Sequence, residues 1–592
     1  MTVTPNPVNV PVGSPQQFTA TVTGTTNTTV TWQVNGMSGG NPTVGTISST
    51  GFYTAPASPP SPATVAITAV SQADTTKSGS ASATIVTMAA FSGAFTWRND
   101  NARTGQNRQE LLLTPATVNP AKFGKVFSFR VDGEVYVQPL YVPNVQVPGQ
   151  GARNVVYVAT EHDTVYAFDA DGRTTSPLWA KSLIPAGGTT VPLPSPDLVC
   201  PDIIHPEIGI TGTPAIDPQT NTLYVVGATK ENSNFVQRLH ALDIATGAEK
   251  FGGPKAIQAS VRGIGAGGDG QGNIPFDSLR QNQRAALLLS GGRVYIAWAS
   301  FCDIDPYHGW LLGYAAANLQ QVAVFNATPN GTEGAIWQSG AGPSADSNGN
   351  IYVITGNGTF DRDTGGVDFG DSFLKLNANL TTVLDFFTPF NQALLSEADL
   401  DVGSGGALLS PDQPGAHPHL IVGGGKEGKL YLVDRDNMGK FHSGDDSQIV
   451  QSFSVSPEGF FSTPAFWENN IYIAGNGDFL KAFRLSGGLL STTPTSQSSA
   501  FFGYPGATPA ISSNGSTNGI VWVLQTEGFA TFEPAILRAY DATDLSVEVY
   551  NSTLAGPRDQ AGPAVKFAVP TVANGRVYVG TGNEVTVYGP LP

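Results

Sequence analysis

A short strand pattern that recurs along most of the chain is the feature that most constrains its fold. Each copy is an apolar run with one large residue near its centre, and there are eight copies, centred on Tyr157, Tyr224, Tyr295, Tyr352, Ile421, Tyr472, Trp522 and Tyr578. The copies lie about 60 residues apart, which is enough for four strands and their loops. The repeat therefore predicts an all-β chain with an eight-bladed β-propeller over residues 94–592.

The sequence around each copy predicts a four-stranded blade. A strand that often begins with a small residue and a proline precedes the copy, as at Pro139, Pro214, Pro464, Pro509 and Pro570. A third strand follows, and a fourth closes most blades. The last repeat runs out at VTVYGPLP, and residues 124–133 can supply its missing strand. Pairing of the N- and C-terminal strands in one blade would close the ring and leave no open sheet edge.

The overall composition agrees with strands and turns. The chain has 69 glycines and 43 prolines, and only 13% of its residues are charged. This composition suits short strands joined by many turns better than a helical bundle. The net charge of -16 repels phosphate backbones and anionic lipids, which argues against nucleic acid or a membrane surface as the main partner.

Residues 1–88 form a separate region rich in Thr, Val and Ser. Segments such as FTATVTG and VTWQVNG alternate apolar and polar residues, as in a β-sandwich whose core includes Trp32. The run from PVGSPQQFTATVTG to GTISSTGFYTAP resembles the bacterial Ig-like repeats of surface proteins, which implies a stalk or adhesive spacer. A linker at about residues 88–93 joins it to the propeller.

The Ig-like resemblance favours export. The N-terminus lacks the basic region followed by an apolar one that marks a signal peptide, as a cytoplasmic protein also would. From the Ig-like resemblance we expect a secreted or cell-surface protein whose signal peptide has been removed. The sequence contains no apolar run long enough to span a bilayer, so we expect no transmembrane segment.

Turns such as DADG, DIATG and DATD resemble those of PQQ-like (pyrroloquinoline quinone-like) propeller repeats. Longer stretches, including FTWRNDNARTGQN and GKEGKLYLVDRDNMGKF, are similar to a family of exported bacterial PQQ-like proteins. The resemblance covers nearly all of residues 94–592 and implies the fold, not an activity.

Long loops of a propeller gather on one face, where binding sites are usually placed. We expect the polar residues near the strand ends of this face to converge on a ligand, although a solvated rim with ion pairs between blades is an equal alternative. The candidates are Glu161, His162, Asp163, Lys230, Arg280, Arg284, Asp303, His308, Lys426, Glu427, Asp478, Lys481 and Lys566.

Two further sites are predicted on this face. Cys200 and Cys302 lie in loops of adjacent blades, so a disulfide between them is geometrically reasonable, the alternative being two free thiols. Asp361, Asp363 and Asp368 alternate with glycines and could hold Ca²⁺, as could the acidic loop 397–401, although the first loop lacks the final Glu of an EF-hand.

Three functions remain open. The favoured one is a surface protein that binds a glycan, a protein or a copy of itself, because no HExxH, GxSxG, Walker or CxxC motif occurs. The second is a PQQ- and Ca²⁺-dependent dehydrogenase of alcohols or sugars. Such enzymes typically carry an adjacent cysteine pair that this chain lacks, so PQQ is possible but not favoured. The third is a lyase or hydrolase that uses residues such as Asp303 and His308.

Overall fold

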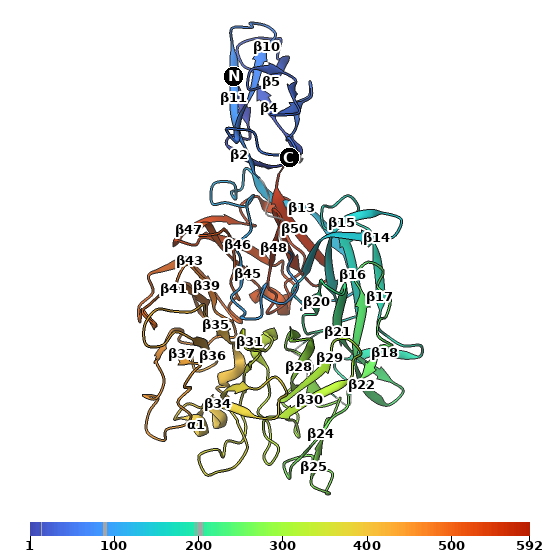
Figure 1. Ribbon diagram of the computed structural model, residues 1–592, viewed down its shortest axis with the longest axis vertical. Helices are drawn as coiled ribbons and strands as arrows, with labels where there is room; N and C mark the ends of the chain where they lie inside the picture. The colour runs from blue at the N-terminus through green and yellow to red at the C-terminus, as the bar shows by residue number, and fades with distance from the viewer. Residues whose placement is uncertain (13–14, 87–91, 196–197, 199–203, 205, 592) are drawn as a thin grey trace.

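The computed structural model describes residues 1–592 except 13–14, 87–91, 196–197, 199–203, 205 and 592. It consists of a small β-sandwich and an eight-bladed β-propeller (Figure 1). The predicted fold class is therefore confirmed. In the described part of the chain, no helix is both long and apolar enough to cross a membrane.

The sandwich has its own core. Its larger sheet has the order β2 (Val8–Pro11), β11 (Ser78–Val86), β10 (Thr64–Ser71), β5 (Val30–Val34) and β6 (Met37–Ser38). The other strands are β1 (Thr2–Thr4) with β4 (Thr19–Thr21), and β3 (Pro15–Gln17), β9 (Phe52–Thr54), β8 (Gly45–Ile47) and β7 (Gly40–Asn41). Trp32 is buried in this core, as predicted, beside Val34 and Tyr53. Membership of the Ig-like family and the domain boundaries stay predictions.

The first four blades follow in chain order, with the inner strand of each blade nearest the axis. Blade 1 has β14 (Leu140–Val147), β15 (Gly151–Ala159), β16 (Thr164–Asp169) and β17 (Trp179–Ser182). Blade 2 has β20 (Ala215–Asp217), β21 (Thr222–Glu231), β22 (Asn234–Asp243) and β23 (Lys255–Ala256), extended by β18 (Gly188–Pro192) and β19 (Glu207–Ile208). Blade 3 has β27 (Leu288–Ser290), β28 (Arg293–Ser300), β29 (Trp310–Ala315) and β30 (Gln321–Asn326), with β26 (Gln281–Asn282). Blade 4 has β31 (Ser344–Ala345), β32 (Ile351–Ile354), β33 (Phe373–Leu376) and β34 (Val383–Phe387).

The remaining blades repeat the pattern. Blade 5 has β35 (Leu408–Leu409), β36 (Leu420–Gly424), β37 (Lys429–Asp434) and β38 (Gln451–Ser454). Blade 6 has β39 (Ala465–Trp467), β40 (Asn470–Ala474), β41 (Asp478–Ser486) and β43 (Ser496–Phe502), with β42 (Leu489–Leu490). Blade 7 has β44 (Ala510–Asn514), β45 (Thr517–Gln525), β46 (Ile536–Asp541) and β47 (Asp544–Asn551). Outside the blades lie the hairpin β24 (Ser260–Arg262) with β25 (Asn273–Pro275), and the short helix α1 (Gln392–Glu397).

Blade 8 closes the ring as the sequence predicts. Its strands β48 (Thr571–Ala573), β49 (Arg576–Gly580) and β50 (Glu584–Pro590) come from the end of the chain. The outer strand β13 (Phe123–Arg130) comes from before blade 1 and pairs antiparallel with β50, with Phe127 opposite Val587. Strands from both ends of the propeller thus hydrogen-bond to each other. Neither strand is left as an unpaired sheet edge at which the ring could open.

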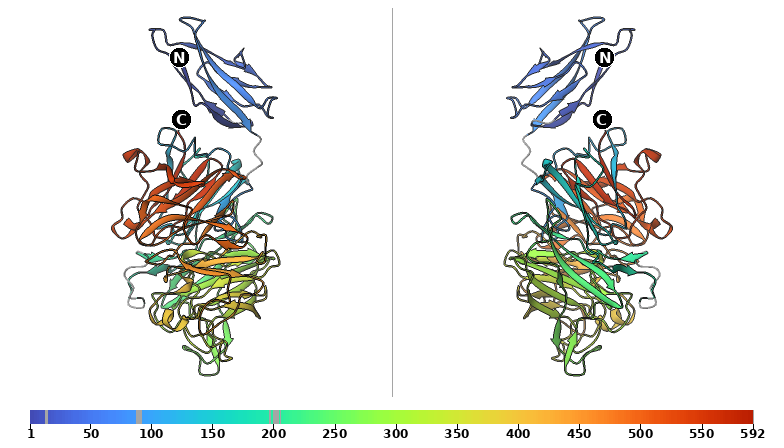
Figure 2. Two further views of the ribbon diagram at one scale, coloured as in Figure 1. Left: turned by 90° about the vertical axis from the view of Figure 1, so that its left-hand side faces the viewer. Right: turned by 90° about the vertical axis from the view of Figure 1, so that its right-hand side faces the viewer.

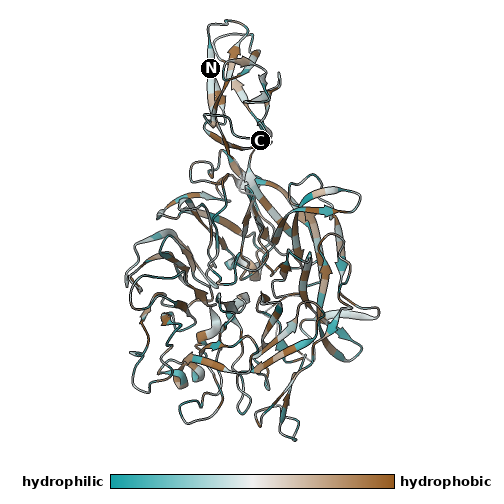
Figure 3. Cartoon of the chain, viewed as in Figure 1, coloured by the Kyte–Doolittle hydropathy of each residue, from teal (hydrophilic) through white to brown (hydrophobic). Residues whose placement is uncertain are grey.

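The repeated tyrosine of the second strand links neighbouring blades. The Tyr157 hydroxyl donates to the Ile244 carbonyl of the next blade at 2.8 Å, and Tyr472 does the same to Ala542 at 2.7 Å. Tyr578 of blade 8 reaches Ala170 of blade 1 at 3.1 Å. These acceptors lie in the turns after third strands, so both repeated sequence features serve the same junction. Many strands of the blades contain apolar stretches (Figure 3), and these pack blade against blade.

A single stretch, residues 94–107, contacts the inner strand of every blade; we call it the axial segment. Its backbone pairs with Tyr141 of blade 1, and its carbonyls accept the N–H groups of the next inner strands, at Ile216, Ala345, Leu409, Phe466 and Ile511. Asn101 Nδ2 donates to Leu289 of blade 3, and Asn107 Nδ2 donates to Val572 of blade 8. The last two residues form β12 (Gln106–Asn107), which pairs with β44.

Two buried arginines hold the axial segment in place. Arg98 Nη1 donates to the Pro509 carbonyl at 2.7 Å, and its Nη2 donates to the Pro464 carbonyl at 2.8 Å. Arg103 Nε donates to the Pro343 carbonyl at 3.1 Å. The prolines that open these inner strands thus present carbonyl oxygens that the two guanidinium groups satisfy, and the axial segment fills that end of the central channel.

Candidate ligand site on the propeller axis

The loops before the inner strands line the other end of the channel. One position, three residues before the proline or its equivalent, recurs in each blade. It is occupied in turn by Tyr136, Thr211, Arg284, Gly340, Ser404, Phe461, Gly506 and Phe567. Four of these are an arginine or an aromatic residue, and they come from blades 1, 3, 6 and 8.

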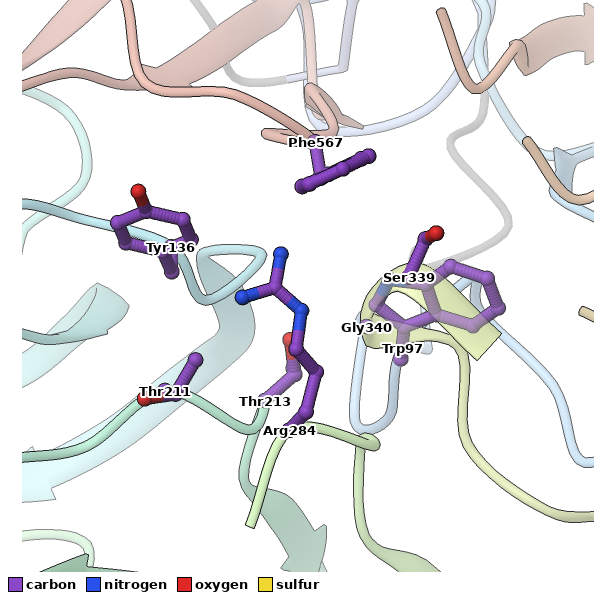
Figure 4. Close-up of a pocket in the computed structure, with 8 residues that line it drawn as sticks. All are labelled: Trp97, Tyr136, Thr211, Thr213, Arg284, Ser339, Gly340 and Phe567. Atoms are coloured by element: carbon purple, nitrogen blue, oxygen red, sulfur yellow. The ribbon is translucent and has the colours of Figure 1, made fainter. Parts of the chain in front are cut away.

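A small pocket lies between this ring of residues and the axial segment (Figure 4). Its lining comprises Trp97, Tyr136, Thr211, Thr213, Arg284, Ser339, Gly340 and Phe567. Its free volume is about 10 Å³, which is room for roughly one water-sized molecule. Trp97, from the axial segment, is 3% exposed and closes the inner end.

Arg284 points into the middle of this pocket (Figure 4). Its Cζ lies 4.8 Å from the ring centre of Phe567, 5.1 Å from that of Trp337 and 5.4 Å from that of Tyr136. The side chain is 1% exposed, and its Nε and Nη1 have no hydrogen-bond partner in the described structure. Burial lowers the pKa of Arg284, because desolvation disfavours the charged guanidinium.

Glu161 is the carboxyl group that interacts electrostatically with Arg284, and it is itself buried. Glu161 Oε2 accepts the Gly209 N–H at 2.9 Å and the Thr211 hydroxyl at 3.1 Å. Burial raises the pKa of Glu161 to about 8, so at neutral pH the group is mainly protonated. Glu161 therefore supplies little of the negative charge that a buried guanidinium requires.

Aromatic rings surround the mouth of the pocket and form what we call the aromatic cup: Trp337, Phe461, Tyr504, Phe529 and Phe567. Ring centres lie 5.5 Å apart for Trp337 and Phe567, and 5.3 Å apart for Phe461 and Tyr504. Tyr504 is 42% exposed, whereas the other four are half-buried. Lys566 places its Nζ 5.1 Å from the ring centre of Phe529, which adds a positive charge to the cup.

Several other candidate residues are engaged in ion pairs away from the pocket. Lys426 Nζ lies 2.6 Å from carboxylate oxygens of both Asp399 and Asp401. Lys481 pairs with Asp478 at 2.6 Å. His162 Nδ1 lies 2.7 Å from Glu207, and this hydrogen bond raises the pKa of the imidazole. Only the His162–Glu207 pair joins neighbouring blades, as the alternative of a rim with ion pairs between blades expects, whereas the Lys481–Asp478 pair lies within one strand.

The remaining candidates are held by nearby groups. Glu427 accepts the Tyr431 hydroxyl at 2.7 Å, and Asp303 accepts the Ser300 hydroxyl at 2.6 Å. Both ring nitrogens of His308 are engaged, with the Thr328 hydroxyl at 3.0 Å and the Ala266 carbonyl at 2.8 Å. His308 is buried and lacks a free nitrogen for proton transfer, so it does not suit the role of a general acid or base.

Three candidates complete the set. Asp163 is fully buried and accepts the Ala228 N–H at 3.3 Å, and burial raises its pKa. Lys230 lies over the ring of Phe235 at 5.1 Å. Arg280 is half-buried in the loop that leads to Arg284. Among these candidates, Arg284 lines the pocket, Glu161 accepts the hydroxyl of the lining residue Thr211, and Lys566 lies over rings of the cup. Lys426 also acts electrostatically on Tyr504 of the cup.

The predicted calcium loop uses its carboxylates locally. Asp361 Oδ1 accepts the Asp368 N–H at 2.8 Å, and Asp368 Oδ1 accepts the Asn330 N–H at 2.9 Å. Within the described residues, no three His, Cys, Asp or Glu side chains are grouped as metal ligands. A calcium ion at Asp361, Asp363 and Asp368 stays a prediction. The Cys200–Cys302 disulfide also stays one, because Cys200 lies outside the described residues.

The axial pocket does not fit PQQ. A ligand of that size needs a cavity of several hundred Å³, whereas about 10 Å³ is free. The rings of Phe567, Trp337 and Tyr136 already occupy the space around Arg284. A planar tricyclic cofactor could enter only if several of these three rings moved away from Arg284.

Solved structures with a similar architecture include quinoprotein dehydrogenases. A quinohemoprotein alcohol dehydrogenase from Pseudomonas putida HK5 aligns with 84% of this chain and 80% of its own, at 13% identity and a TM-score of 0.54. A europium-containing methanol dehydrogenase aligns with 85% of this chain and 99% of its own, at 11% identity and a TM-score of 0.56. The fold is that of a PQQ-like propeller. At these identities the likeness shows the fold alone. No family model and no curated protein matches the sequence.

Reasoning from the sequence missed the aromatic cup and the role of the axial segment. A signal for two rings of the cup and one ring of the pocket was present, because Phe461, Phe567 and Tyr136 each stand three residues before a proline that opens an inner strand. Reading the repeats in register would have placed these rings with Arg284 around one axis. For Trp337, Tyr504 and Phe529, which lie in irregular loops, the repeat gives no equivalent position.

Proposed function

We propose that the protein is a binding propeller whose aromatic cup takes a saccharide unit of an extracellular glycan. The observation that carries the proposal is the cluster of five rings at the axial mouth, above a buried arginine. All five rings come from loops on the same face, the face that carries the longest loops. Loops on a rigid scaffold are the usual place for a binding site.

The chemistry of the cup supports a sugar as the ligand. Rigid aromatic rings offer flat apolar surfaces at a low entropic cost, and the apolar C–H face of a pyranose can pack against them. The exposed Tyr504 adds a hydroxyl beside the rings, which suits the hydroxyls of the same ligand.

In this proposal the sandwich acts as a spacer. It lies beyond the edge of the propeller, next to blade 8, and covers neither face of the ring (Figure 2). Such a module would hold the cup away from a surface. We therefore include a secreted or cell-surface location in the proposal, supported by the resemblance of residues 1–88 to Ig-like repeats.

Glycan binding can be tested directly. The full chain is screened on a glycan array, and the affinity of each hit is then measured by calorimetry. We expect Tyr504→Ala and Phe529→Ala each to weaken binding by at least about fivefold, because rings that stack on a ligand contribute about 1–3 kcal/mol each. The matched control is Phe251→Ala, which removes a ring that is 37% exposed on the opposite face.

The same preparation tests the alternative. Titration of PQQ with Ca²⁺, followed by a dye-linked oxidation assay on alcohols and sugars, is expected to show neither binding nor turnover. Stoichiometric binding with turnover would contradict the proposal and turn the funnel into an active site. Equal glycan affinity in the wild type and both cup variants would also overturn it.

A further inference from the structure

Arg284 is a buried cation without an anionic partner in the described structure. Its side chain is 1% exposed, two of its nitrogens have no hydrogen-bond partner, and its guanidinium lies over the faces of aromatic rings. The other two buried arginines on the axis differ, because Arg98 and Arg103 donate to backbone carbonyls. A guanidinium left uncompensated in such a place strongly destabilises the fold unless an anion pairs with it.

The pocket around Arg284 is suited to an anion. Thr213 Oγ1 accepts the Gln138 N–H at 2.9 Å, which leaves its own proton for the pocket. Thr211 donates to Glu161, and Ser339 donates to the Ser404 carbonyl at 2.6 Å, so these hydroxyls are held in place. Arg284 Nε and Nη1 supply charged donors into the same space.

The size of the space limits what it can hold. A free volume of about 10 Å³ accommodates roughly one water-sized molecule, so a single halide ion, which is slightly larger, or one oxygen of a carboxylate is the anionic group nearest to that size. Phosphate and sulfate are too large unless the surrounding rings move. The mouth of the pocket leads to the aromatic cup, so a carboxylate could also arrive as part of a ligand held there.

We propose that Arg284 is the centre of a small-anion site on the propeller axis. The anion is a free halide such as chloride, or the carboxylate of an acidic sugar unit bound in the cup. The second source rests on the proposed function, whereas the first does not. In either case the bound anion compensates the positive charge of the buried Arg284. Because it binds only the folded protein, it also stabilises the fold by mass action.

Bromide titration of the full chain tests the site. Trp97 lines the pocket and Trp337 lies over Arg284, so bromide bound there should quench their fluorescence in a saturable way, at constant ionic strength set with sulfate. We expect the saturable component to disappear, or its midpoint to rise at least about tenfold, in Arg284→Gln. The matched control Arg280→Gln, in the same loop, should keep it. Identical curves for wild type and Arg284→Gln would overturn the proposal.

A crystallographic arm does not depend on any variant folding. Crystals of the wild-type chain grown or soaked in sodium bromide should show an anomalous peak within about 3.5 Å of an Arg284 nitrogen. Absence of a peak there, together with no displacement of bromide by acetate in solution, would also overturn the site.

Competition experiments distinguish the two sources. If the anion is a free halide, bromide affinity is unchanged in Tyr504→Ala. If the anion belongs to the ligand, galacturonate displaces bromide more effectively than acetate, and Tyr504→Ala removes that advantage. Binding of bromide at Arg284 with no glycan bound would leave this site standing and reject the proposed function. Binding of neutral glycans with no bromide binding at Arg284 would support the proposed function and reject the anion site.

Discussion

Charged side chains on the axis illustrate how burial alone can change the state of a residue. Glu161 accepts two hydrogen bonds and still has its pKa raised from 4.5 to about 8, since desolvation outweighs those bonds. Asp371 shows the same behaviour near α1, where burial raises its pKa to about 8. Neither group was recognisable from the sequence as a carboxyl that stays protonated at neutral pH.

These shifts predict a stability that falls as the pH rises. Between about pH 4.5 and pH 8 the unfolded chain has released the Glu161 proton while the folded chain retains it. Each pH unit in this window therefore costs about 1.4 kcal/mol of unfolding free energy for this group. Urea unfolding at pH 5, 6, 7 and 8 measures the slope. We expect Glu161→Gln to reduce the slope by about that amount, and an unchanged slope would show that Glu161 ionises normally.

At the scale of elements, the axial segment joins the inner strands around the central channel. It contacts all eight inner strands, so it couples blades that do not touch one another. Arg98 is central to this coupling, because it donates to carbonyls of blades 6 and 7.

We predict that Arg98→Met destabilises the propeller by at least about 3 kcal/mol, because it leaves buried carbonyl oxygens without a donor. The control is Arg108→Ala, just after the segment, which removes a surface ion pair with Glu468 and should cost about 0–1 kcal/mol. Denaturant unfolding measures both. Equal losses in the two variants would mean that the axial segment does not hold the blades together.

Ring closure gives a second prediction for an element. Phe123 at the start of β13 is fully buried against the rings of Tyr550, Trp522 and Tyr588. Phe123→Ala should therefore cost about 3–5 kcal/mol, and deletion of residues 124–133 should lower the melting temperature further. A melting temperature unaffected by the deletion would contradict the closed blade 8.

For the whole molecule, the two cores are separate. The cluster around Trp32 and Tyr53 contains residues of the sandwich alone. A chain of residues 92–592 should accordingly fold and keep the main unfolding transition of the full protein, measured by calorimetry. Insoluble or molten material would show that the propeller needs the sandwich.

The sequence by itself determined the number of blades, their strand order and the closure between the two ends. These features depend on a local period, which the apolar second strand repeats in all eight copies and the proline and tyrosine positions repeat in most of them. The same information placed the long loops on one face.

Only the tertiary structure decided which side chains meet at the axis. Tyr136 and Phe567 are far apart in the sequence and lie around one guanidinium because the ring closes. Conversely, Lys426 and Asp478 stand at similar strand ends and are paired with neighbouring charges. Whether a polar residue is free to bind depends on the groups that burial brings around it, and those contacts do not follow from the spacing of the repeats.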